Sequence, residues 1–493
     1  MNQEPLHFGR VALRGSLMTG VSQAVRIGVQ FVSVAVLARL LAPQDFGLVA
    51  AVGPVVAFVG LFQNLGLQQA VVQRSGIDKD QLNRMFWVMT AVGLSCTVVV
   101  LLISPAIAWF YGDPRMRNIA ILAGLPLLIG SMAGLPLSLL NRRLRFGQLA
   151  MLDAASAVLG FLLAAAAAWR GLGYWSLLIG SAASAAITLA GAWRCSRWTP
   201  GPPDFRIDRD ILSFGANLTG FNLVNFFARN LDNILIGKYS GTVELGYYDR
   251  AYKLLLFPIQ NIVTPLSRVM IPLLSRVQHD KQRFREIYLR TTWMLAFVTA
   301  PGIAALVLTS DQVVDLLFGP KWQAVSPIFA WLGIAGLVQS ANNTTGWIFI
   351  CQGKTGTMFR WGIYSSVTTI AAFLVGLPWG AAGVAAAYAI SGYLLRTPVL
   401  AVAVHRVGPV SGYDFALVQF FYVGSSIAAW LLLHFFPGIF LRSSDFADIV
   451  VAALLCYGLA VLFTLAVPGP RRMALRIWGS IAGMRRPDAT VSI

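Results

Sequence analysis

Polar side chains that could bind an anion lie inside apolar runs of this sequence. The stretch NLTGFNLVNFFARNLDNILIGK, residues 217–238, is apolar enough for a membrane but contains Arg229 and Asp232. At 100° per residue, a helix would place its polar residues within one arc of roughly 100°. The arc contains Asn222, Asn225, Arg229, Asp232 and Asn233. An arginine among amides can hold an anion and offer further hydrogen bonds.

A second polar stripe lies in the first apolar run. It contains Thr19, Ser22, Gln23, Arg26, Gln30 and Ser33, on one face of a predicted helix. A shift of 199 residues carries Gln23 onto Asn222, Arg26 onto Asn225, Gln30 onto Arg229 and Ser33 onto Asp232. A charge at the bilayer centre costs at least ~2.5 to 3.5 kcal/mol and faces protein or a water-filled cavity. We therefore expect the two stripes to face each other across a central cavity.

Structural interpretations of the stripes stay open beside this one. Arg229 and Asp232 are three residues apart and could form an ion pair on their own helix. Asn and Gln side chains also join helices through hydrogen bonds. Arg26 has no acidic residue on its own predicted helix, and an unpaired buried cation favours an anionic partner.

Composition indicates an integral membrane protein. The 493 residues are 57% hydrophobic and 12% charged, with a mean hydropathy of +0.68, so a soluble domain would lack polar surface. Apolar runs of about 20 residues match a helix crossing ~30 Å of hydrocarbon, whereas barrel strands would be half as long. The net charge of +18 comes from basic residues scattered between these runs. We therefore expect contact with membrane lipids and no nucleic acid partner.

The apolar runs predict an all-α polytopic membrane protein with about 14 transmembrane helices. Placing the N-terminus in the cytoplasm puts most loop Lys and Arg on the cytoplasmic side, and both termini then lie there. The helices are expected near residues 17–38, 47–67, 86–108, 118–140, 149–169, 172–193, 211–236, 248–274, 291–309, 323–349, 360–377, 382–403, 414–435 and 447–467.

The stripes belong to a wider internal repeat. ARLLAPQDFGL, from Ala38, aligns with GKYSGTVELGY, from Gly237, and the alignment pairs Gly47 with Gly246. It also pairs Arg39 with Lys238 and Asp45 with Glu244. We expect two related six-helix lobes in one orientation, residues 1–200 and 201–408. Two additional helices in 409–470 and a basic cytoplasmic tail in 471–493 would follow.

Two predicted helices carry further signals. QSANNTTGW, residues 339–347, places amides and hydroxyls mid-span, where they could line a cavity or join packed helices. Pro258, Pro265 and Pro272 recur every seven residues and predict a bent helix.

Few features favour an enzyme. The chain has no long outer loop, no glycine-rich phosphate loop of the P-loop type and no metal-like spacing of carboxylates or His. Cys96, Cys195, Cys351 and Cys456 are far apart and are interpreted as packing thiols. We expect no catalytic residue, no metal and no cofactor.

Three segments resemble the polysaccharide transporter family of oligosaccharide flippases. They are LARLLAPQDFGLVA from Leu37, LGLQQAVVQR from Leu65 and GYYDRAYKLLLFPI from Gly246. This family lies in the superfamily of multidrug, oligosaccharidyl-lipid and polysaccharide exporters. FGPKWQAVSPIFAWLG, from Phe318, resembles the branch of colanic acid and succinoglycan exporters.

The resemblance implies two six-helix lobes around a cationic cavity with alternating access in a bacterial inner membrane. It implies a substrate of undecaprenyl diphosphate carrying an oligosaccharide, moved to the periplasmic leaflet for exopolysaccharide or lipopolysaccharide assembly. Polysaccharide polymerase and co-polymerase proteins are implied as further partners. Lipid II flippases similarly carry an arginine on the first helix, where Arg26 stands.

Our hypothesis is therefore a non-enzymatic flippase. Arg26 and Arg229 would hold the diphosphate, and Gln23, Gln30, Asn222 and Asn225 would hydrogen-bond phosphate or sugar. Asp232 would orient Arg229 or respond to a coupling cation. The alternatives are drug or cation efflux on the same fold, which predicts an acidic cavity, and a polytopic glycosyltransferase or ligase, which requires outer acidic residues or a large outer loop. A purely structural scaffold would tolerate loss of both arginines.

Overall fold

The computed structural model describes residues 5–63, 67–68, 71, 76–205, 226, 230–436, 438, 444–468 and 471–472, which form helices and no strand. The expected all-α membrane fold is confirmed. Ten helical segments of the described residues are long and apolar enough to cross a membrane, or up to 11 if a bent helix pair is one span. The seventh expected helix, residues 211–236, lies mostly outside the described residues, and the total of 14 stays a prediction.

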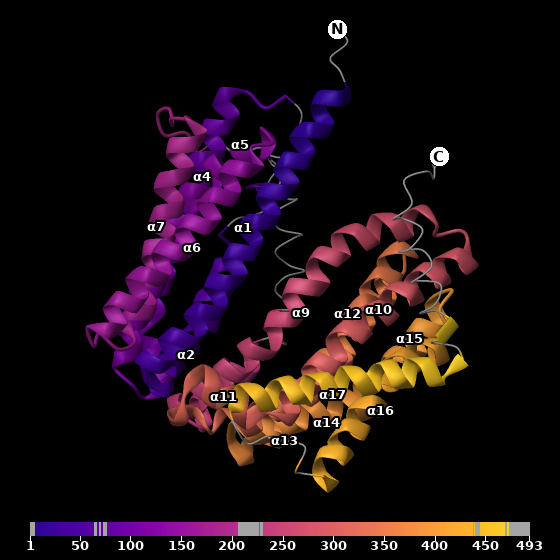
Figure 1. Ribbon diagram of the computed structural model, residues 1–493. Coiled ribbons are helices and arrows are strands. Elements are labelled where there is room, and N and C mark those ends of the chain that lie inside the picture. Colours follow the sequence, from indigo (N-terminus) through magenta and orange to yellow (C-terminus); the bar gives the residue numbers. More distant parts are fainter. Residues whose placement is uncertain are drawn as a thin grey trace. The chain divides into compact units, whose positions relative to one another are not determined.

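The chain packs as two compact units, Met1–Asp249 and Arg250–Ile493. The predicted division at residue 200 concerns an internal repeat, which compact packing does not test, and it stays a prediction. The helices of the first unit are α1 (Pro5–Leu40), α2 (Pro43–Gly60), α4 (Lys79–Tyr111), α5 (Arg115–Arg142), α6 (Phe146–Trp169) and α7 (Trp175–Ser196), and α9 (Thr242–Arg276) begins there (Figure 1).

Small residues let the helices of the first unit pack closely. In this unit α4 packs on α5, α5 and α6 pack on α7, and α1 packs on α6 (Figure 1). A Cβ on Gly160 would lie 3.0 Å from the carbonyl oxygen of Gly180, and a Cβ on Gly180 would lie 3.0 Å from that of Gly160. Since lipid tails are as apolar as the helices, such backbone approach supplies the packing energy.

The two glycines paired by the internal repeat meet in the first unit. A Cβ on Gly47 of α2 would lie 1.6 Å from the carbonyl oxygen of Thr242. A Cβ on Gly246 of α9 would lie 2.0 Å from that of Pro43. The two contacts are reciprocal, because the shift that carries Gly47 onto Gly246 also carries Pro43 onto Thr242. An internal repeat predicts this reciprocity.

The second unit contains the rest of α9 and the C-terminal helices. These are α10 (Lys281–Leu308), α11 (Ser310–Phe318), η1 (Pro320–Trp322), α12 (Val325–Cys351), α13 (Thr355–Gly376), η2 (Leu377–Trp379), α14 (Gly380–Ser391), η3 (Gly392–Arg396), α15 (Thr397–Val407), α16 (Gly412–Phe435) and α17 (Asp445–Ala466). The segment η3 is a π-helix, so the helix of α14 and α15 is interrupted by a local bulge.

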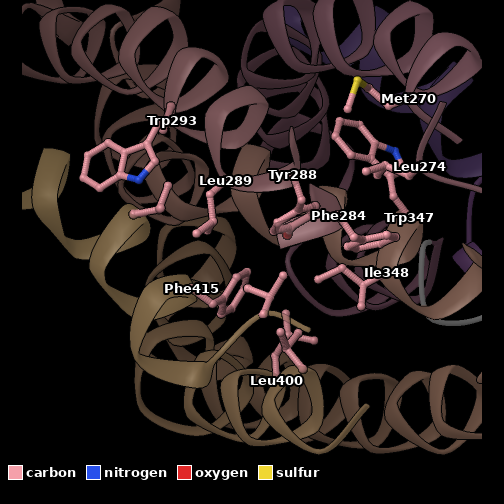
Figure 2. Packing of buried hydrophobic residues seen from close by; sticks show 14 of the residues in the cluster. Met270, Leu274, Phe284, Tyr288, Leu289, Trp293, Trp347, Ile348, Leu400 and Phe415 are labelled. Carbon is pink, nitrogen blue, oxygen red and sulfur yellow. The ribbon is translucent and has the colours of Figure 1, made fainter. Parts of the chain in front are cut away.

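Aromatic side chains dominate the core of the second unit. Figure 2 shows Tyr288 and Phe284 of α10 between Trp347 of α12 and Phe415 of α16. The rings of Tyr288 and Trp347 meet edge to face at 6.4 Å, and the Trp347 indole donates a hydrogen bond of 2.9 Å to Ser267. The indole N–H of Trp347 therefore has a hydrogen-bond acceptor inside the core.

The mid-span polar residues of α12 join helices. Ser340 Oγ and Thr299 Oγ1 of α10 are 2.9 Å apart, and Thr344 Oγ1 lies 2.8 Å from the hydroxyl of Tyr288. Ser340 and Thr344 are fully buried. Of the two interpretations left open by the sequence, packing is the one these contacts favour.

One of the three prolines of α9 lies at a bend. Thr242–Leu256 and Asn261–Arg276 meet at 44°, and the break between them includes position 258, a proline. The predicted bent helix is confirmed.

Candidate functional site

The first polar stripe lies on one continuous helix. α1 spans 36 residues, and the side chains of Arg26 and Gln30 are exposed while that of Gln23 is half-buried. At 100° per residue these three lie within about 60° of one another. The described part of the stripe therefore presents one guanidinium and two amides along a single face.

A different face of α1 is apolar. Val25 and Val32 are 41% and 47% exposed and lie close together in angle, roughly 100° or more from Arg26 and Gln30. An exposed valine face suits lipid, whereas an arginine at this depth requires a polar environment. The helix thus separates a lipid-compatible face from the polar stripe.

Two hydrogen bonds fix α1 and α2 against α6 and the segment that follows it. The hydroxyl of Ser22 donates to the carbonyl oxygen of Ala150 at 2.6 Å, and the backbone N–H of Tyr174 donates to Asp45 Oδ1 at 3.0 Å. The partners are 128 and 129 residues apart in sequence. The Ser22 bond joins α1 to α6, and the Asp45 bond joins α2 to the residue before α7, so the chain runs in the same direction through both pairs.

This register brings an acidic residue to Arg26. Asp153 lies three residues after Ala150, and Arg26 lies four after Ser22, so both are about one turn beyond the Ser22–Ala150 hydrogen bond. The two side chains carry opposite charges, and both are exposed. Asp153 was missed by sequence reasoning, which considered acids only on the helix of Arg26.

Most of the second stripe cannot be compared with the prediction. Asn222, Asn225 and Arg229 lie outside the described residues. Asp232 is described and is only 4% exposed. Its Oδ2 accepts a hydrogen bond of 2.9 Å from the hydroxyl of Tyr248, and its Oδ1 accepts one from the N–H of Asn233. Neutral donors thus satisfy this carboxylate within the first unit.

A second membrane-depth arginine, Arg396, was also missed. It ends η3, is 9% exposed, and donates a hydrogen bond of 2.8 Å to Thr369 Oγ1 of α13. Its guanidinium carbon lies 4.1 Å from the ring centre of Tyr388, and Nε has no partner among the described atoms. An arginine inside an apolar run is the signal that selected Arg26, and it applied equally here.

Comparisons with known proteins place this geometry in context. The family model described as "Polysaccharide biosynthesis protein" matches residues 36–327. The teichuronic acid biosynthesis protein TuaB of Bacillus subtilis is 27% identical over 71% of this chain and 73% of its own. The succinoglycan biosynthesis transport protein ExoT of Rhizobium meliloti is 26% identical over 72% of each chain. The lipopolysaccharide biosynthesis protein WzxC of Escherichia coli is 22% identical over 74% of this chain and 75% of its own.

Solved structures share the fold. The lipid II flippase MurJ, in an inward closed conformation, matches with a TM-score of 0.69 and 13% identity over 92% of this chain and 98% of its own. An inward-facing multidrug transporter of the MATE family matches with a TM-score of 0.56 and 14% identity over 78% of this chain and 94% of its own. At these identities the similarity establishes a polytopic helical transporter fold.

Proposed function

The chain belongs to the polysaccharide biosynthesis protein family, and we propose that it is a flippase that moves lipid-linked oligosaccharides across the membrane for polysaccharide assembly. The names of its relatives, which include a succinoglycan transport protein, support a role in transport. The observation that carries the site is Arg26, an exposed guanidinium beside Gln30 on a membrane-spanning helix. No enzymatic step is part of this proposal.

The finer proposal concerns the substrate and its contacts. The substrate is an oligosaccharide on undecaprenyl diphosphate, passed from the cytoplasmic to the periplasmic leaflet of a bacterial inner membrane, with both termini of the protein cytoplasmic. Arg26 and Arg229 hold the diphosphate because a guanidinium matches phosphate oxygens in bidentate geometry. Gln23, Gln30, Asn222 and Asn225 donate further hydrogen bonds, and Asp232 orients Arg229 or responds to a coupling cation. A polymerase and co-polymerase receive the product.

The charge of the substrate sets a physical limit on energy coupling. Moving a net charge of about −2 outward across an inside-negative membrane is favoured by ~4 to 5 kcal/mol per 100 mV. The membrane potential alone can therefore supply the free energy for uniport of this substrate. Flipping by the purified protein in liposomes should accelerate when an inside-negative potential is imposed, and indifference to the potential would exclude charge-moving uniport.

Complementation of a deletion strain tests the site. Arg26→Ala and Arg229→Ala should abolish surface polysaccharide and cause lipid-linked repeat units to accumulate, with normal amounts of protein in the membrane. Arg26→Lys should retain part of the activity, because it keeps the charge but loses the bidentate geometry.

Arg115→Ala is the matched control. Arg115 forms an exposed ion pair with Asp113 at 2.8 Å, and exposed pairs contribute about 0 to 1 kcal/mol. This variant should produce normal polymer. Normal polymer from both Arg26→Ala and Arg229→Ala would remove these arginines from the transport site.

A further inference from the structure

Asp153 is an isolated carboxylate at membrane depth. It is the single acidic residue of α6 and lies seven residues after Phe146, about 10 Å along the helix. Its side chain is exposed on the surface of the first unit. Such a charge is costly in a bilayer unless a partner compensates it. The other residues of α6 do not supply this compensating partner.

The register of α1 and α6 supplies the partner. The hydrogen bond from Ser22 to Ala150 joins α1 to α6, which pack on each other, with an offset of 128 residues. A second bond, from Tyr174 to Asp45, joins the segments that follow these helices with a similar offset of 129 residues. This offset places Arg26 beside residue 154, directly next to Asp153. The two side chains carry opposite charges, yet no ion pair shorter than 4 Å joins them among the described contacts. Among the described residues, each side chain is exposed and is not held in a close pair with the other.

We propose that Asp153 is the internal counter-ion of Arg26 and competes with the substrate's diphosphate for that guanidinium. This inference rests on the proposed function. When the site is empty, Asp153 compensates the arginine at membrane depth. When a diphosphate binds, Arg26 turns its donors to the phosphate oxygens, and the nearby carboxylate repels the ligand. Asp153 is a positioning residue that prevents Arg26 from binding the substrate too tightly to release it.

Competition predicts an effect that structural damage does not produce. Removing the charge of Asp153 should tighten the binding of a diphosphate, because the ligand no longer displaces a counter-ion or meets a like charge. Couplings between sites of this kind are typically 5- to 150-fold, so we expect the Kd of Asp153→Asn to fall about five- to tenfold. Asp153→Glu keeps the charge and should bind with nearly native affinity.

The test uses the purified full chain in nanodiscs of zwitterionic lipid, with geranyl diphosphate as the probe and uncharged geraniol as its control. Calorimetric titration gives the Kd for the native chain, Asp153→Asn, Asp153→Glu, Arg26→Gln and the double variant Arg26→Gln/Asp153→Asn. Asp80→Asn, which removes one exposed acid from the start of α4, controls for net charge. If Asp153→Asn does not fold, Asp153→Ser takes its place.

The expected result is tighter binding in Asp153→Asn, no change in Asp80→Asn, and no tightening when Arg26 is already absent. Unchanged or weaker binding in a folded Asp153→Asn overturns the proposal, as does equal tightening in the Arg26→Gln background. Unfolding of the ligand-free native chain, Asp153→Asn, Arg26→Gln and the double variant gives an independent double-mutant cycle, in which the two substitutions should be non-additive. A native chain that shows this coupling but binds no geranyl diphosphate rejects the proposed diphosphate site and the competition with it. If the native chain binds the probe but the two substitutions have additive effects on the free energy of unfolding, only the counter-ion role is rejected.

Discussion

The hydroxyl of Tyr248 donates a hydrogen bond of 2.9 Å to Oδ2 of Asp232, and both side chains are almost completely buried. The acid lies in the second predicted stripe, and the tyrosine is the third residue of the segment GYYDRAYK that carries the family resemblance. A buried carboxylate is tolerated when several donors satisfy it. Tyr248 therefore links the start of α9 to the acid that precedes it in the chain.

Tyr248→Phe tests this link. Loss of the hydroxyl leaves a buried acceptor with one donor fewer, and the expected cost is about 1 to 3 kcal/mol in the free energy of unfolding. Thermal unfolding in detergent measures it. Tyr239→Phe is the control, because the Tyr239 side chain is 71% exposed and its hydroxyl can bond to solvent. Equal melting temperatures for the two variants would show that the hydrogen bond contributes nothing.

Gly47→Ala should be among the most damaging single methyl additions in the first unit. Its Cβ would fall 1.6 Å from the carbonyl oxygen of Thr242, so that α2 and α9 must separate. Overpacking of this kind costs about 1 to 3 kcal/mol or more. Gly53→Ala, on the same helix, meets no atom within 4 Å and should be neutral or slightly stabilising through helix propensity. The yield of folded protein and the melting temperature are measured for Gly47→Ala and for Gly53→Ala.

Thr369→Val removes one acceptor of a buried cation, Arg396. Arg396 would lose its 2.8 Å hydrogen bond to Thr369 Oγ1 while Nε is already without a partner among the described atoms. We expect a loss of about 1.5 to 3 kcal/mol, the range for hydrogen bonds to charged groups. Thr368→Val is the control, since that hydroxyl bonds the Tyr364 carbonyl oxygen within its own helix. An equal loss in both variants would contradict the role assigned to Thr369.

Asp45→Ala should cost more than the loss of an ordinary helix cap. Its carboxylate accepts from the N–H of Ala42 at the start of α2 and from the N–H of Tyr174 before α7, each at 3.0 Å. Asp78→Ala is the matched change at α4, where the side chain accepts from Gln81 in the same helix, and such caps contribute about 0.5 to 2 kcal/mol. Chemical denaturation compares the two, and a smaller loss for Asp45→Ala would remove its bridging role.

Features encoded within one helix could be predicted from the sequence. The polar face of α1, with Arg26 and Gln30, follows from residue spacing alone, and Pro258 predicted the bend of α9. The repeat alignment paired Gly47 with Gly246, although their close contact required the fold. For the polar face and the bend, one segment contains the whole signal, whereas the repeat requires a comparison of two segments.

Features that depend on the register between helices could not be predicted. Asp153 becomes a partner of Arg26 only because α1 and α6 run parallel with a particular offset. Ser340 and Thr344 of α12 could line a cavity or join helices, and their partners on α10 decide between these. Arg396 was within reach of the sequence signal, but its hydrogen bond to Thr369 of α13 is a tertiary contact.

The reciprocal contact of Gly47 and Gly246 also bears on how the protein is made. Gly47 leaves the ribosome about 200 residues before its partner, which at about 5 to 20 residues per second is a delay on the order of ten to forty seconds. During this interval α1, α2, α4, α5, α6 and α7 enter the membrane without the residues that complete their unit. A nascent chain truncated before Thr242 should therefore be more sensitive to membrane proteases than one that ends after Asp249.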